Sequence, residues 1–156
     1  MFTLLLSCFL LGCVTGLRSL TAPAAVCWGA YLGWLHFAGT RLAFIGHSAT
    51  LIIFTLLALL ELIIDKLPRT PARTAGPGLS GRVLMGAFCG SALAVSAGGS
   101  VIVTAVAGIA GALAGAFGGY NLRHHLVTKK NLPDFPVALV EDIIAIAGGL
   151  LIVSHL

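Results

Sequence analysis

Apolar residues run through the chain in long stretches that short polar segments separate. Six stretches approach the roughly 20 residues that a helix needs to cross the hydrocarbon layer of a membrane. They cover about Phe2 to Leu17, Pro23 to Ala38, Ala49 to Lys66, Arg82 to Gly98, Ser100 to Asn121, and Pro136 to the C-terminus. The pattern predicts an all-α fold, a polytopic transmembrane bundle of about six helices that forms one domain over residues 1–156.

The second stretch is the least regular of the six, because it is short and holds Trp28, Tyr31, Trp34 and His36. Aromatic residues of this kind gather at membrane interfaces. A tilted, interfacial or re-entrant helix is therefore the alternative to a full crossing. Five crossings in place of six would reverse part of the topology.

A short internal match suggests that the chain contains a repeat. The residues 58–64 match 138–144 at five of seven positions, 80 residues further along. Two halves of three helices each, about 1–76 and 81–156, would have opposite orientations because three is odd. This is the inverted-repeat plan of many transporters, although so short an apolar match also arises by chance.

Composition supports a lipid environment and argues against a nucleic-acid partner. Of the 156 residues, 58% are hydrophobic and 9% are charged, whereas a soluble domain has about 25% charged residues. The mean hydropathy is +1.06. The net charge of +4 is spread over loops between apolar stretches, and no contiguous basic face is formed as nucleic-acid binding requires.

The basic loops predict the orientation of the chain in the membrane. With six crossings, three connections fall on one side, and only Arg41 falls on the other. The shared side carries Arg18, Lys66, Arg69, Arg73, Arg82, Arg123, Lys129 and Lys130. The positive-inside rule makes this side cytoplasmic. We therefore expect a multi-pass protein of the plasma membrane with both termini outside.

Small residues recur at a spacing of four in two of the predicted helices. One stripe is Gly111, Gly115 and Gly119, and the other includes Gly86 and Gly90. In lipid, no hydrophobic effect drives helices together. Van der Waals packing must do so, and small residues allow the close contact that it requires. We expect packing within the chain, and a subunit interface of a homo-oligomer is the alternative.

Acidic residues inside apolar stretches are the first candidates for function, because a membrane makes charge expensive. Glu61 lies in the third stretch, with Asp65 on the same face. Glu141 and Asp142 fall in the first turns of the sixth, where the helix dipole also favours an acid. For Glu61, a structural ion pair with Arg18 or Arg123 competes with a role in binding a proton, cation or substrate.

Basic residues supply candidate anion sites. Arg18 precedes the start of the second helix, where free N–H groups favour an anion, and Arg123 follows the fifth. Lys66, Arg69 and Arg73 lie in a loop stiffened by prolines. An arginine side chain binds phosphate or carboxylate through two parallel N–H hydrogen bonds. This loop is therefore predicted to bind an anion or a lipid headgroup. Simple attraction to anionic lipids is the alternative.

The sequence lacks common catalytic and metal-binding signatures. The histidines show no HExxH spacing, the four cysteines form no CxxC, and neither a GxSxG nor a Walker motif occurs. We therefore predict no metal, no cofactor and no enzyme activity.

Three segments together resemble a known family. They are the run Gly16-Leu17-Arg18-Ser19-Leu20-Thr21-Ala22-Pro23, the run from Glu61 through Asp65-Lys66-Leu67-Pro68-Arg69-Thr70-Pro71 to Thr74, and Pro136 with Glu141-Asp142. This pattern resembles the bacterial membrane-protein family catalogued as domain of unknown function 4126. The resemblance implies a small polytopic protein of the bacterial inner membrane, and it assigns no activity and no site residue.

Two functional hypotheses follow. The first is a small transporter or channel for a solute or ion, in which Glu61, Glu141, Arg18 and Arg123 line a pathway near the midplane. The second is a non-transporting module that binds lipid headgroups or a partner protein through the 66–82 loop. An enzyme acting on lipid is the weakest alternative.

Overall fold

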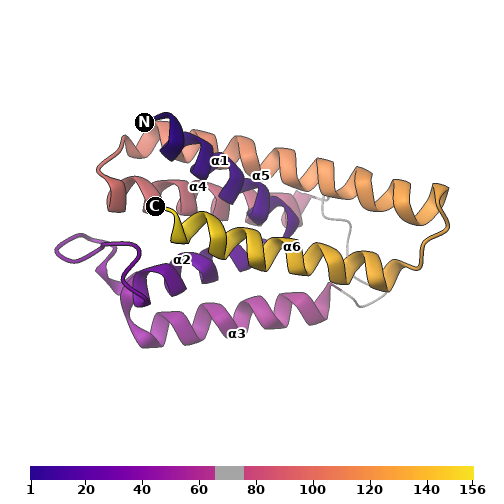
Figure 1. The fold of residues 1–156 in the computed structure, drawn as a ribbon, viewed down its shortest axis with the longest axis horizontal. Helices are drawn as coiled ribbons and strands as arrows, with labels where there is room; N and C mark the ends of the chain where they lie inside the picture. Colours follow the sequence, from indigo (N-terminus) through magenta and orange to yellow (C-terminus); the bar gives the residue numbers. More distant parts are fainter. Residues whose placement is uncertain (66–75) are drawn as a thin grey trace.

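The computed structural model describes residues 1–65 and 76–156, and all of its regular secondary structure is helical (Figure 1). Its elements are α1 (Phe2–Leu17), α2 (Thr21–Tyr31), the 3₁₀ turn η1 (Ala43–Gly46), α3 (Ser48–Ile64), α4 (Gly76–Ala97), α5 (Val101–His124), the π turn η2 (His125–Lys129) and α6 (Asp134–Ser154). The described residues contain no strand. The predicted all-α bundle of six helices is confirmed. The candidate anion residues Lys66, Arg69 and Arg73 lie outside the described residues.

Successive helices run up and down, so the connections alternate between the two ends of the bundle (Figure 1). Both termini lie at one end, together with the 32–47 connection that contains Arg41. The opposite end holds the turn between α1 and α2, the end of α3, the start of α4 and the connection from α5 to α6. The basic residues Arg18, Lys129 and Lys130 belong to connections at this end, which we call the basic end.

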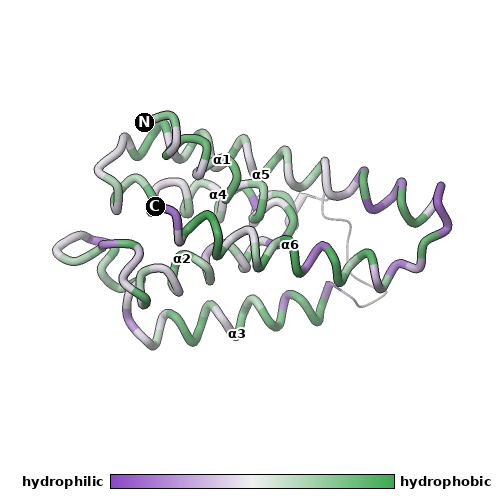
Figure 2. The backbone as a smooth tube through the Cα atoms, viewed as in Figure 1, coloured by the Kyte–Doolittle hydropathy of each residue, from purple (hydrophilic) through white to green (hydrophobic). Residues whose placement is uncertain are grey.

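The length and surface of the helices are compatible with a membrane protein. Within residues 1–65 and 76–156, three helical segments are long and apolar enough to cross a membrane: 22 residues in Gly76–Ala97, 29 in Val101–Lys129 and 21 in Asp134–Ser154. The apolar helices α1 and α3 are shorter, with 16 and 17 residues. Large apolar side chains such as Ile52, Leu56 and Ile63 are more than half exposed, and apolar residues dominate all of these helices (Figure 2). Such a surface suits a lipid environment.

The second helix is shorter than the predicted stretch from Pro23 to Ala38. It ends at Tyr31 after 11 residues, a length of about 16 Å, so that α2 alone is too short to cross. Gly33 ends it with a φ of +78°, a conformation that suits glycine. The N–H of Trp34 donates to the carbonyl of Gly29 at 2.8 Å, which is the bond of a Schellman motif. Gly33 was the sequence signal for this stop.

The helices form two groups, and glycines set the spacing in the first. In that group α1, α4 and α5 lie side by side (Figure 1), and α1 and α5 make the most extensive contact in the bundle. A methyl group on Gly111 or Gly115 would overlap the backbone oxygen of Phe9 or Cys13 on α1. A methyl group on Gly86 or Gly90 would likewise overlap the backbone of α5. Both stripes therefore serve packing within the chain, as expected, whereas Gly119 lies in the wall of a cavity instead.

The second group consists of α2, α3 and α6. It contacts the first through α2 and α6, which lie mostly against α1. The core between the groups includes Leu11, Val26, Leu93 and Val153, all fully buried. Each group therefore combines helices from both halves of the chain. The inverted repeat stays a prediction: under that plan α2 corresponds to α5, yet it has 11 residues against 24.

The glycine spacing predicts a contrast between two substitutions in α5. Gly115→Ala should lower the stability of the protein in mild detergent by about 1–3 kcal/mol, because the methyl group forces α1 away from α5. Gly118 faces open space in the same helix, so Gly118→Ala should change stability by less than about 1 kcal/mol. Thermal unfolding followed by circular dichroism measures both, and equal effects would contradict this account of the packing.

Candidate functional site at the basic end

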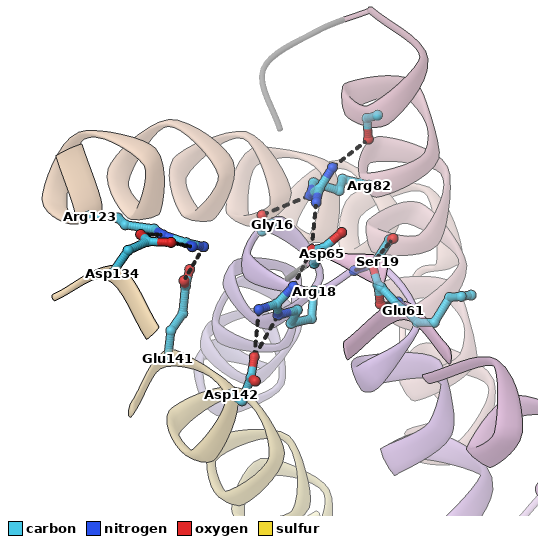
Figure 3. A network of polar contacts seen from close by, with 12 residues as sticks. Gly16, Arg18, Ser19, Glu61, Asp65, Arg82, Arg123, Asp134, Glu141 and Asp142 are labelled. Carbon is cyan, nitrogen blue, oxygen red and sulfur yellow. Dashed lines mark hydrogen bonds and ion pairs between the residues drawn. The ribbon is translucent and has the colours of Figure 1, made fainter. Parts of the chain in front are cut away.

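All five acidic residues of the chain lie toward one end of the helices (Figure 3). Glu61 and Asp65 stand at the C-terminal end of α3, while Asp134, Glu141 and Asp142 stand in the first turns of α6. Three arginines, Arg18, Arg82 and Arg123, accompany them. We call the group Arg18, Asp65, Arg82 and Asp142 the Arg18 centre, and the group Arg123, Asp134 and Glu141 the Arg123 group.

Arg18 is fully buried between carboxylates from two helices. Its Nε donates to Oδ1 of Asp142 on α6 at 2.8 Å, and its Nη2 lies 2.6 Å from the same oxygen. Its Nη1 pairs with Oδ2 of Asp65, the residue that ends α3. The arginine thus joins the turn after α1 to both α3 and α6, as Figure 3 shows.

Arg82 completes this centre from α4. Its Nε donates to the carbonyl of Gly16 at 3.1 Å, and its Nη2 lies 3.9 Å from Oδ2 of Asp65. Gly16 belongs to the last turn of α1, where carbonyls have no partner within the helix and the helix dipole is negative. Arg82 therefore caps α1 from a neighbouring helix. From the sequence, Arg82 is expected only as a loop residue that sets orientation. Its position in the first turns of an apolar helix was the signal that it has a buried partner.

Glu61 binds backbone groups instead of the predicted arginine. Its carboxylate accepts the N–H groups of Ser19 and Leu20, both at 2.8 Å, and the hydroxyl of Ser19 also donates to it. These groups precede α2, whose N-terminus carries positive partial charge. Glu61 on α3 therefore caps α2, and the ion pairs of Arg18 are with Asp65 and Asp142. Glu61 and Asp65 contact the same turn, in keeping with their predicted common face.

Arg123 and Glu141 are brought together in the Arg123 group, beside the Arg18 centre (Figure 3). Two nitrogens of Arg123 donate to the two carboxylate oxygens of Asp134 at 2.8 and 2.7 Å, a bidentate pair. Oε2 of Glu141 lies 3.9 Å from Nη1 of Arg123. Asp134 was not singled out from the sequence, because it lies in a polar connection with no periodic pattern around it.

The candidate residues therefore occupy one end of the helices rather than their middle. The reason is electrostatic: the end of α1 attracts a cation and the start of α2 attracts an anion, and both ends meet in the turn after Leu17. That Glu61, Glu141, Arg18 and Arg123 line a pathway stays a prediction. Among the described residues, no group of three or more His, Cys, Asp or Glu side chains has the arrangement of a metal site.

Comparison with known proteins adds no relative. No family model, no curated protein and no solved structure matches the chain. The resemblance to the bacterial family therefore stays a prediction, and the function is argued from the chain itself.

Removal of the buried Arg18 side chain should strongly destabilise the protein. We expect Arg18→Met to lower stability by about 3–5 kcal/mol, since Asp65 and Asp142 lose the cation that compensates them away from water. Arg41→Met, in the connection at the opposite end, serves as the control and should have little effect. Unfolding in mixed micelles measures the difference. If the Arg18 variant unfolds like the control, the centre does not hold the helices together.

Proposed function

We propose that this membrane protein is a small transporter in which the Arg18 centre closes one end of the substrate pathway. The single observation that supports the proposal is the complete burial of Arg18 between carboxylates on α3 and α6. Ionisable groups away from water in a membrane protein are expensive, and a functional role is their usual explanation. The ion pairs of Arg18 hold α3 and α6 to the turn after α1. A change of charge on either carboxylate would weaken these contacts.

The chemistry of the centre favours an anionic solute that moves together with protons. Guanidinium groups bind carboxylate or phosphate oxygens with two parallel hydrogen bonds. An anion that enters would compete with Asp65 for Arg18 and Arg82. A proton on Asp65 would cancel its charge and leave Nη1 of Arg18 and Nη2 of Arg82 to the anion, while Arg18 keeps its bonds to Asp142. The two events together would loosen α3 from the turn after α1 and open this end.

Several other predictions accompany the proposal without adding to it. The alternative of a lipid-headgroup module rests on Lys66, Arg69 and Arg73, which lie outside the described residues. The glycine stripes that suggested a homo-oligomer are used inside the chain, so self-association stays a separate prediction. We also keep the prediction that the protein is not an enzyme.

The transport proposal is tested by flux. Protein in liposomes that contain a pH-sensitive dye should show proton uptake when a gradient of inorganic phosphate or succinate is applied. Asp65→Asn should reduce that uptake about tenfold or more, equivalent to about 1.4 kcal/mol, because it cannot gain or lose the coupling proton. Asp134→Asn changes an acid whose side chain is 59% exposed and should leave uptake nearly unchanged.

Two outcomes would contradict the transport proposal. One is an intact wild-type protein that moves neither phosphate nor succinate above protein-free liposomes. The other is an Asp65→Asn variant that folds and transports like the wild type.

Orientation is tested separately with single cysteines. The two substitutions are Ser100→Cys and Thr128→Cys. Ser100 lies just before α5, Thr128 lies just after it, and both residues are exposed. We expect an impermeant thiol reagent added outside intact cells to label the first and not the second, since the basic end should be cytoplasmic. The unsubstituted protein is the control for its own four cysteines. Labelling of both sites from outside would contradict the crossing by α5.

A further inference from the structure

A second site lies where α5 and α6 separate at the basic end. An apolar cavity of about 410 Å³ opens there between α1, α5 and α6. Leu17, Leu122, Val137 and Val140 are among the residues of its wall. The volume falls within the range of roughly 300–1,000 Å³ that is usual for small-molecule sites.

The wall of this cavity has one charged part, formed by Arg123 and Glu141. Arg123 also lines a smaller hollow of about 210 Å³ with Tyr120, His124, Val127, Thr128 and Asp134. Arg123 is the residue that the two linings have in common. An apolar cavity that shares an arginine with a hollow containing polar side chains suits an amphipathic molecule.

The net positive charge around the hollow favours an anionic headgroup over a neutral one. The α5–α6 region carries Arg123, Lys129 and Lys130 against Asp134 and Glu141, three basic residues against two acidic ones. The Nε and Nη2 of Arg123 donate to Asp134, and its Nη1 lies 3.9 Å from Oε2 of Glu141, so the guanidinium is fixed in the wall of both spaces. Both lysines are exposed, and His124 and Thr128 add hydrogen-bonding groups that suit phosphate.

From this juxtaposition we infer a binding site for an anionic phospholipid, with its phosphate in the hollow beside Arg123 and one acyl chain in the apolar cavity. Lipid tails are as apolar as the cavity wall, so tail burial alone gives no preference over the surrounding bilayer. The headgroup must supply the selectivity. This inference does not depend on transport through the Arg18 centre.

The test is lipid retention, measured by native mass spectrometry of the full chain released from micelles that contain equal amounts of phosphatidylglycerol and phosphatidylcholine. The wild type should retain phosphatidylglycerol preferentially. Lys129→Gln with Lys130→Gln should reduce that preference by about fivefold for each lysine, as expected for basic residues near an anionic surface. Arg41→Gln, at the other end of the bundle, should leave the preference unchanged.

The position of the acyl chain is tested by filling the cavity. Val137→Trp should abolish retention of both lipids, whereas Ile143→Trp places the same side chain on an exposed part of α6 outside the lining and should not. Val140, more than half exposed in the cavity wall, offers a milder site if Val137→Trp fails to fold.

Three results would overturn the inference. They are equal retention of the two lipids by the wild type, unchanged retention after Trp substitution in the cavity, and loss of a dimer, rather than of lipid, in those variants. The last result would identify a second copy of the chain as the occupant. None of these measurements involves flux, so a failure here is distinct from a failure of the transport proposal.

Discussion

The structure depends on one constraint: a charge that is buried away from water must find its partner within the protein. Few ionisable residues are present, and the chain places all five of its acids toward one end, where helix termini and arginines neutralise them. Arg18 and Arg82 bring α3, α4 and α6 to the turn after α1. Because an uncompensated charge costs more than a lost apolar contact, this end determines which helices become neighbours.

The rest of the bundle is held by contact rather than by charge. Between α1, α4 and α5 the backbones approach so closely that glycine is required at the crossings. Such packing is rigid, because no side chain is available to adjust. The group of α2, α3 and α6 has fewer glycine contacts and relies more on its attachments at the basic end. A change of charge there would therefore act on the second group more than on the first.

The sequence predicted the coarse features well, and physical reasons explain where it stopped. Long apolar stretches predicted the helices, and glycines at a spacing of four predicted the close packing of Gly111 and Gly115. Expensive charges pointed to Arg18, Asp65 and Asp142. Their partners were beyond reach, because a pairing across 124 residues depends on how helices pack. The end of α2 was missed although Gly33 marked it, since a single glycine within an apolar stretch is also compatible with a continuing helix.

The continuous helical segment Val101–Lys129 has a consequence for the bilayer itself. Its 29 residues extend about 44 Å at 1.5 Å per residue, whereas a typical hydrocarbon core is about 30 Å thick. Its neighbour α1, with 16 residues, extends only about 24 Å. Two tightly packed helices of such unequal length cannot both match a flat membrane. The lipid around the bundle must thin near α1, or the long helix must tilt and carry its last turns into the headgroup region.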